Sequence, residues 1–179
     1  MKIGLLILLT AGFSSCEMVK GWFEVDFETT LNGDLDIDIQ ESAKKSTNDD
    51  TPFNSSATVD PFDDEEIAEY QDNITNIEIT GIIAEVLSVN KTSVIFRSGT
   101  TISVSGDGKT ASWKMGNDWT IIKGTELNLE DVGGTYDLVK EILDTFGEFE
   151  VSAQGVCSES GVSITLRIGI HTLITANPL

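Results

Sequence analysis

The segment Val162-Ser-Ile-Thr-Leu-Arg-Ile-Gly-Ile170, near the end of a chain of 179 residues, carries the clearest indication of the fold. Its large apolar side chains all occupy positions of one parity: Val162, Ile164, Leu166, Ile168 and Ile170. Because successive side chains of a strand point to opposite faces, this pattern predicts a long strand with one buried face. An apolar sheet face must pack against a second layer, so the segment favours a packed, sheet-based domain.

The composition is that of a folded domain, and its charge argues against one class of partner. Hydrophobic residues make up 40% of the chain and charged residues 23%, which is ordinary for a protein that buries a core. One domain is expected at this length. The 30 acidic and 11 basic residues give a formal charge of -19, which argues against nucleic acid, since a phosphate backbone requires Lys and Arg. One His and two Cys exclude most metal clusters, catalytic triads and disulfide frameworks.

A glycine-containing turn next to the long strand predicts its neighbour. A two-residue turn at Ser160-Gly161 would pair Cys157 with Ile164, and it would set His171 opposite Glu150. Cys157 is then interpreted as a small buried residue, because a reactive thiol needs a basic partner to lower its pKa. His171 is interpreted as half of a surface ion pair, since no nucleophile is marked beside it.

A second turn of the same type lies at Asp107-Gly108. It pairs Val104 with Ala111 and Ile102 with Trp113, so the apolar faces of the two strands agree. We therefore predict a hairpin here.

Residues 23–39 alternate apolar and acidic side chains on both sides of Asn32-Gly33. A two-residue turn at Asn32-Gly33 would place Phe27 opposite Asp38, which mixes the faces. A three-residue loop that includes Leu31 instead pairs Phe27 with Ile37. The sequence therefore favours a hairpin with the odd loop.

This predicted hairpin brings carboxylates together on its other face. Asp26 would lie opposite Asp38, and Glu28 opposite Asp36, which is unfavourable without relief. Calcium accepts several carboxylates in flexible geometry, so these four residues are the candidate metal ligands. The alternative is an acidic sheet face in open solvent, where exposed charges repel only weakly.

Further segments complete the expected domain. Residues 77–89 predict another extended stretch, with Gly81 as a bulge, and residues 41–56 predict a polar loop that Phe53 pins to the domain. Acidic residues 63–66 have the spacing of a helix start, and a second helix is expected from about Thr135 to Phe146. The fold class expected is mainly β: an antiparallel β-sandwich or barrel-like domain with two short capping helices.

The first fifteen residues read as a secretory signal, with Lys2 before an apolar core that is too short to span a bilayer. Phe13-Ser14-Ser15-Cys16 resembles the lipobox of bacterial lipoprotein precursors, although Phe13 stands where that family most often has Leu. The resemblance implies cleavage before Cys16 and acylation of this cysteine, with palmitate as the expected lipid.

The resemblance also implies a location. Residues 1–15 would be the signal peptide, residues 16–22 a lipidated tether, and residues 23–179 a single β-rich domain. The protein is then expected to be exported and lipid-anchored to the bacterial cell envelope, at the outer membrane or cell surface, with the membrane as one partner.

Aromatic residues are the possible stacking groups for a sugar: Trp22, Trp113, Trp119, Tyr70 and Tyr136. Alternation places Trp113 and Trp119 on an apolar face, which favours core packing. The sequence marks no catalytic residue and no cofactor-binding motif. The function expected is a non-enzymatic structural or interaction role with an envelope protein or a glycan. The alternative is a surface module that binds a glycan or peptide, with calcium dependence left open.

Overall fold

The computed structural model describes residues 24–41 and 50–177. Within these ranges the chain forms the following elements: β1 (Val25–Ile39), β2 (Thr51–Val59), η2 (Pro61–Asp63), α1 (Glu65–Tyr70), η3 (Gln71–Asn73), β3 (Ile74–Val89), β4 (Val94–Phe96), β5 (Thr101–Gly106), β6 (Lys109–Lys114), β7 (Trp119–Ile121), β8 (Glu126–Asn128), α2 (Thr135–Leu143), β9 (Phe149–Cys157) and β10 (Val162–Ala176).

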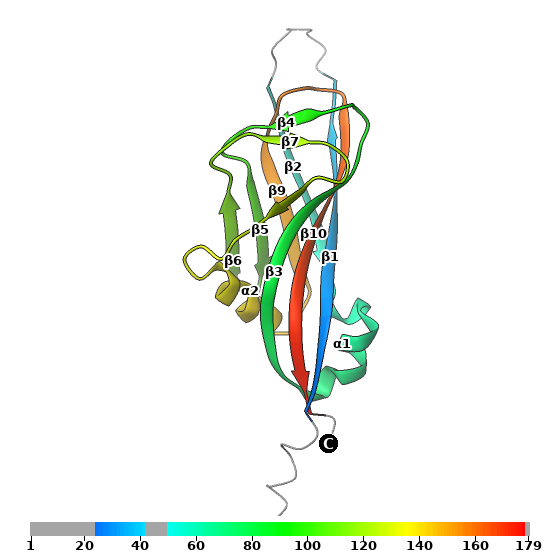
Figure 1. The fold of residues 1–179 in the computed structure, drawn as a ribbon, viewed down its shortest axis with the longest axis vertical. Coiled ribbons are helices and arrows are strands. Elements are labelled where there is room, and N and C mark those ends of the chain that lie inside the picture. Colours follow the sequence, from blue (N-terminus) through cyan, green and yellow to red (C-terminus); the bar gives the residue numbers. More distant parts are fainter. Residues whose placement is uncertain (1–23, 42–49, 178–179) are drawn as a thin grey trace, which may run out of the picture.

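Two antiparallel sheets pack face to face, as Figure 1 shows. The first sheet has the order β1-β10-β3-β8 and is called sheet A here; the second contains β6, β5, β9, β4 and β7, with β2 paired to β9, and is called sheet B. The prediction of a mainly β, antiparallel sandwich with short helices is confirmed. The sheets are not closed into a barrel, so of the two expected forms the sandwich is correct.

Strand β10 is the centre of sheet A. It pairs with β1 along its whole length, from Val162↔Ile39 to Ala176↔Val25, and with β3 on its other side. Its inward side chains form an unbroken buried row: Val162, Ile164, Leu166, Ile168, Ile170, Thr172, Ile174 and Ala176. The parity predicted from residues 162–170 therefore continues to the end of the strand.

The hairpin predicted within residues 23–39 is wrong, because β1 runs straight through Asn32 and Gly33 as one strand. Gly33 lies at a close approach to sheet B: a Cβ built on it would overlap Val151, and it would lie 3.0 Å from Val59. The glycine is therefore required by packing between the sheets and not by a turn.

The predicted β9–β10 pairing is also wrong. Ser160 and Gly161 do lie in a turn, with Gly161 at φ +64°, but the strands that it joins belong to different sheets. Cys157 pairs with Thr51 of β2 and Phe96 of β4 instead of Ile164. The chain crosses from sheet B to sheet A at this turn. The apolar faces of β9 and β10 therefore pack against each other across the sandwich instead of lying side by side in one sheet.

Other local predictions are confirmed. Strands β5 and β6 form the expected hairpin, with Asp107 and Gly108 at φ +49° and +72° in its turn. Strand β3 has a bulge at Thr80, next to Gly81, and the bulge reverses which parity is buried. Ile83, expected on the same face as Ile77, consequently lies on the other face of sheet A and is only half-buried.

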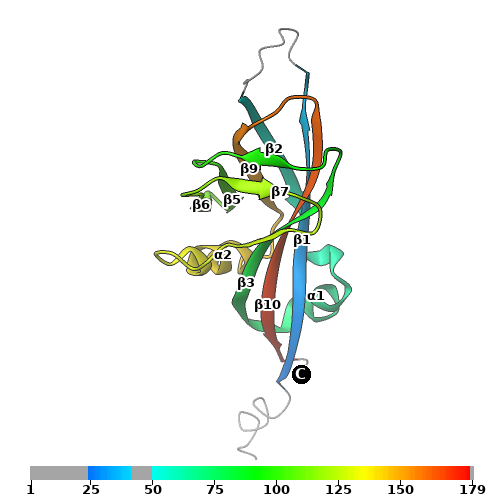
Figure 2. The same ribbon diagram turned by 45° about the horizontal axis from the view of Figure 1, so that its top comes forward.

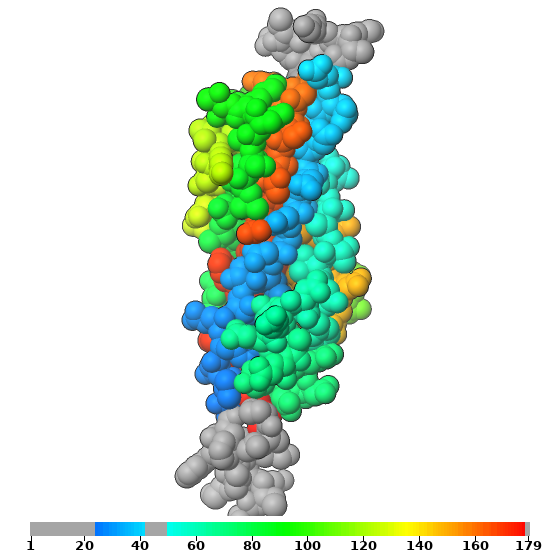
Figure 3. Space-filling view, turned by 90° about the vertical axis from the view of Figure 1, so that its right-hand side faces the viewer, coloured from blue at the N-terminus to red at the C-terminus, as the bar shows by residue number. Residues whose placement is uncertain are grey.

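The polar loop predicted over residues 41–56 is shorter than expected, since Thr51–Ser56 belong to β2; residues 42–49 lie outside the described ranges. Phe53 is buried and its ring stacks on Phe96, with 4.4 Å between ring centroids, so it does pin this segment to the core. Figure 3 shows β2 lying beside β1, where the Ser55 hydroxyl donates a hydrogen bond to the Asp36 carbonyl oxygen (2.8 Å).

Both predicted helices form, and they lie on opposite sides of the long strands (Figure 2). Asp64 caps α1, accepting hydrogen bonds from the backbone N–H groups of Glu66 and Ile67. Helix α2 ends at Leu143, before the expected Phe146, which adopts a left-handed φ of +51°. Among the described residues, no helix has the length and apolar character needed to cross a membrane.

The packing of Gly33 generates a stability prediction. We expect Gly33→Ala to lower the free energy of unfolding by about 1–3 kcal/mol, because the new methyl group overpacks the space held by Val151. Gly116→Ala is the matched control, since nothing lies within 4 Å of a Cβ at that position. Urea unfolding measures both. Equal stabilities of the two variants would contradict the packing of β1 over β9.

Candidate functional site

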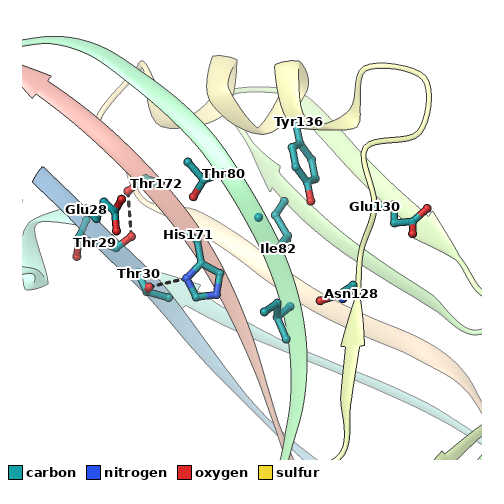
Figure 4. Close-up of a pocket in the computed structure, with 12 residues that line it drawn as sticks. Glu28, Thr29, Thr30, Thr80, Ile82, Asn128, Glu130, Tyr136, His171 and Thr172 are labelled. Carbon is teal, nitrogen blue, oxygen red and sulfur yellow. Dashed lines mark hydrogen bonds between the residues drawn. The ribbon is translucent and has the colours of Figure 1, made fainter. Parts of the chain in front are cut away.

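A hollow of about 670 Å³ lies on sheet A where β8 separates from β3 (Figure 4). It is lined by residues from β1, β3, β8, β10 and the start of α2. Its polar lining includes Glu28, Thr30, Asn128, Glu130, Tyr136 and His171. The hollow therefore gathers side chains that are far apart in the sequence.

His171 lies at the middle of the β1 side of the hollow. It is half-buried on the outward face of β10, and its Nδ1 lies 2.9 Å from the Thr30 hydroxyl on β1. On its other side β10 pairs His171 with Gly81, where a Cβ would stand 3.7 Å from the imidazole Cδ2. The glycine thus leaves the ring open on the β3 side.

Tyr136 forms the opposite side, at the start of α2. Its hydroxyl donates a hydrogen bond to the Leu129 carbonyl oxygen (2.9 Å), and this bond fixes the loop that leaves β8. The same loop is held by the Trp113 indole, which donates to the Glu130 carbonyl oxygen (2.9 Å). Glu130 itself is exposed at the rim of the hollow.

Helix α2, which carries Tyr136, lacks a side-chain hydrogen bond from its N-terminal cap residue. Gly134 is its N-terminal cap residue, in the left-handed region at φ +81°, and supplies no side-chain hydrogen bond. Asp131 supplies the capping interaction instead. Its carboxylate accepts hydrogen bonds from the Thr135 hydroxyl (3.2 Å) and from the Tyr136 backbone N–H (3.1 Å). Gly133 and Gly134, both at positive φ, therefore turn the chain into α2.

These groups suit the binding of a polar ligand. An imidazole, a threonine hydroxyl, an amide and two carboxylates can exchange hydrogen bonds with a bound molecule. The hydroxyl of Thr30 already has His171 as a partner, and that of Tyr136 donates to the backbone.

The carboxylates predicted to meet in a hairpin lie along one strand. Asp26 and Asp38 are twelve positions apart on β1, which is about 40 Å in an extended chain. Glu28 lines the hollow, whereas Asp36 lies toward the other end of β1. The sequence argument for calcium ligands at these four residues therefore loses its basis. No cluster of three or more metal-ligating side chains occurs within residues 24–41 and 50–177.

The carboxylates of β1 accept hydrogen bonds from hydroxyl groups of β10. Asp26 accepts a hydrogen bond from the Thr175 hydroxyl (2.8 Å) and Asp36 from the Thr165 hydroxyl (3.1 Å). The Ser163 hydroxyl lies 3.4 Å from Asp38. An acidic row on β1 thus faces a row of donors on β10 along the outer face of sheet A.

One pair in this row is ionic. Arg167 donates two hydrogen bonds to Asp34, at 2.7 and 2.8 Å, in the bidentate geometry that suits a guanidinium. The hydrogen bond from Arg167 holds the pKa of Asp34 below its ordinary value and raises that of Arg167. The pair is partly exposed, so its contribution to stability is modest.

The other predicted residues have structural roles or lie elsewhere. Cys157 is fully buried, and burial raises the pKa of its thiol, as expected for an inert residue. Trp113 is buried in the core, and Trp119 packs edge-on against Phe96 at 6.1 Å. The predicted contact between His171 and Glu150 is wrong, because β9 lies in the other sheet. Cys16 and Trp22 lie outside the described residues.

Tyr70 has a structural role, and several residues of the hollow were not predicted from the sequence. Tyr70 packs against Phe27, with 5.4 Å between ring centroids, so it supports the end of β1. Sequence reasoning did not single out Thr30, Asn128 or Glu130. Glu28, Gly81, Tyr136 and His171 were each singled out in the sequence for other reasons, and no sequence pattern indicated that they line one hollow.

Comparisons of the chain with protein-family models, with curated proteins and with solved structures find no match.

The Asp34–Arg167 pair generates a pH prediction. Since the pKa of Asp34 is lowered in the folded state, the pair stabilises the protein above the ordinary aspartate pKa of 3.8. This contribution is lost as the pH falls through the folded-state value. At pH 7 we expect Asp34→Asn to reduce the free energy of unfolding by at most about 1 kcal/mol, given the exposure of the pair.

The difference between the wild type and Asp34→Asn should shrink as the pH falls below 3.8, where Asp34 of the wild type is progressively protonated. Urea unfolding at a series of pH values measures this, with Glu28→Gln as a control that breaks no ion pair among the described residues. A difference that stays constant from pH 7 to pH 2 would contradict the assignment.

Proposed function

We propose that this protein is a lipid-anchored lipoprotein of the bacterial cell envelope, and that its sandwich domain has a non-enzymatic interaction role. The anchoring part is carried by one observation, the apolar segment that ends in Phe13-Ser14-Ser15-Cys16. The interaction part is supported by the hollow at His171, whose side chains are arranged for hydrogen bonding.

The first strand of the domain begins close to Cys16 in the sequence, which is compatible with a short tether to the membrane. Cys16 precedes Val25, the first residue of β1, by nine positions. Val25 pairs with Ala176 at one end of an elongated domain, so an anchor at Cys16 would make this end face the membrane (Figure 1). Asp26 and Glu28, near this end, would be repelled by anionic headgroups and would keep the domain off the surface.

A glycan-binding role based on stacking receives less support. Trp113, one of the candidate stacking residues, is buried against the core and cannot offer its ring face to a sugar. Tyr136 is half-buried, and its hydroxyl is engaged with the backbone. We therefore favour a partner that is recognised by hydrogen bonds and charge.

The anchoring proposal is tested by labelling with radioactive palmitate in a bacterium that expresses the full chain. We expect the wild type to incorporate label and to sediment with membranes, and Cys16→Ala to lose the label. Cys157→Ala is the matched control: its thiol is buried in the core, so labelling should be unchanged. Equal labelling of the wild type and Cys16→Ala would contradict lipidation at this residue.

A further inference from the structure

The outer edge of β3 is open along half of its length. On this side β3 pairs with β8 only from Ile83 to Glu85, and the Leu129 N–H closes the pairing by donating to the Ile82 carbonyl oxygen (2.9 Å). From Ile74 to Gly81, no other strand within residues 24–41 and 50–177 pairs with this edge. An open strand edge offers backbone donors and acceptors to another extended chain.

The regular part of this edge is short. Bulges at Thr75 and Thr80 bound it, which leaves the four residues Asn76–Ile79 in regular pairing with β10. Four residues span about 13 Å, so the edge can accept a short strand. The bulges twist the backbone on either side, and they protect the edge from pairing along its whole length.

Helix α2 forms a wall beside this edge. A hollow of about 380 Å³ lies between Asn76–Ile79 and the residues Asp131, Tyr136, Asp137 and Lys140. It shares Lys140 with a second hollow, of about 250 Å³, that continues toward Phe146. It shares Tyr136 with the hollow at His171. The hollow between Asn76–Ile79 and α2 lies along the open edge and is called the β3 groove here.

The β3 groove is negatively charged. Glu78 on the strand and Asp137 on the helix are exposed, and neither is within ion-pair distance of a Lys or Arg among the described residues. Lys140 is neutralised within the groove, because its ammonium donates to both carboxylate oxygens of Asp144 at 3.1 Å. Asp131 adds a further carboxylate at the helix start.

The negative charge of the β3 groove favours some binding partners over others. A second copy of the chain, pairing β3 with β3, would bring two acidic grooves together, which is unfavourable. An extended segment with basic side chains at alternate positions would place its charges on the face that carries Glu78, since side chains on one face of a strand repeat every second residue. Charge complementarity therefore favours a basic partner.

We propose that the β3 groove binds an extended segment of a partner protein, with Lys or Arg at alternate positions, which adds to sheet A as a strand outside β3. Main-chain hydrogen bonds to Asn76–Ile79 give the affinity, and the carboxylates of Glu78 and Asp137 give the preference for basic side chains. This inference deepens the proposed interaction role and names its partner class.

The test uses the full chain, purified in detergent, and a fluorescent peptide that alternates lysine and valine over six residues. Binding is measured by anisotropy at low salt. We expect saturable binding that weakens about fivefold or more in Glu78→Gln/Asp137→Asn, because two of the attracting charges are removed. Glu85→Gln is the matched control: it lies on the same strand where β8 covers the edge, and it should bind within about twofold of the wild type.

A second peptide separates strand addition from simple attraction of charge. It carries the same lysines, but N-methylation of alternate backbone nitrogens removes the donors needed for pairing. We expect it to bind at least about fivefold more weakly, given the lost hydrogen bonds. Equal binding of both peptides, or no binding of either, would overturn the proposal.

Residue-specific amide exchange locates the bound peptide. We expect the lysine–valine peptide to slow exchange within Asn76–Ile79 and to leave the amides of Ile83–Glu85 unchanged, since these already pair with β8. Protection elsewhere with none in Asn76–Ile79 would overturn the site. The binding assay does not depend on the lipid, so its failure is distinguishable from a failure of the palmitate experiment.

Discussion

Pairing of β10 on both sides along its length is the constraint on which the other elements depend. Its inward row is buried from Val162 to Ala176, so both β1 and β3 must extend to cover its backbone. The upper half of this three-stranded ribbon packs on sheet B. The lower half extends past sheet B, where α1 packs beside β1 and α2 beside β3 (Figure 2). The groove along β3 exists because β8 stops at Asn128, before that lower half.

Sequence patterns predicted those features that depend on neighbouring residues. Alternation identified the buried face of β10, a left-handed Asp107-Gly108 turn fixed the β5–β6 hairpin, and acidic residues marked the start of α1. Each of these depends on backbone geometry within a few residues. The sandwich followed, because several amphipathic strands with no long helix have few other ways to bury their faces.

What the sequence could not predict is which strand pairs with which. Asn32-Gly33 has the composition of a turn, yet Gly33 is needed where β1 passes Val151 of sheet B, a contact that no local pattern reveals. The turn at Gly161 was located correctly, but a turn does not state whether its strands stay in one sheet. The site was missed for the same reason, because Thr30 and His171 meet only when β1 pairs with β10.

The architecture of sheet A depends on β1 being one continuous strand, which contacts between protons of neighbouring strands can establish. We predict nuclear Overhauser contacts that join Phe27 to Ile174 and Ile37 to Ile164, as the pairing of β1 with β10 requires. A hairpin within residues 23–39 would instead bring Phe27 next to Ile37. Contacts between Phe27 and Ile37, with none to Ile174, would show that β1 is not continuous and is detached from the centre of sheet A.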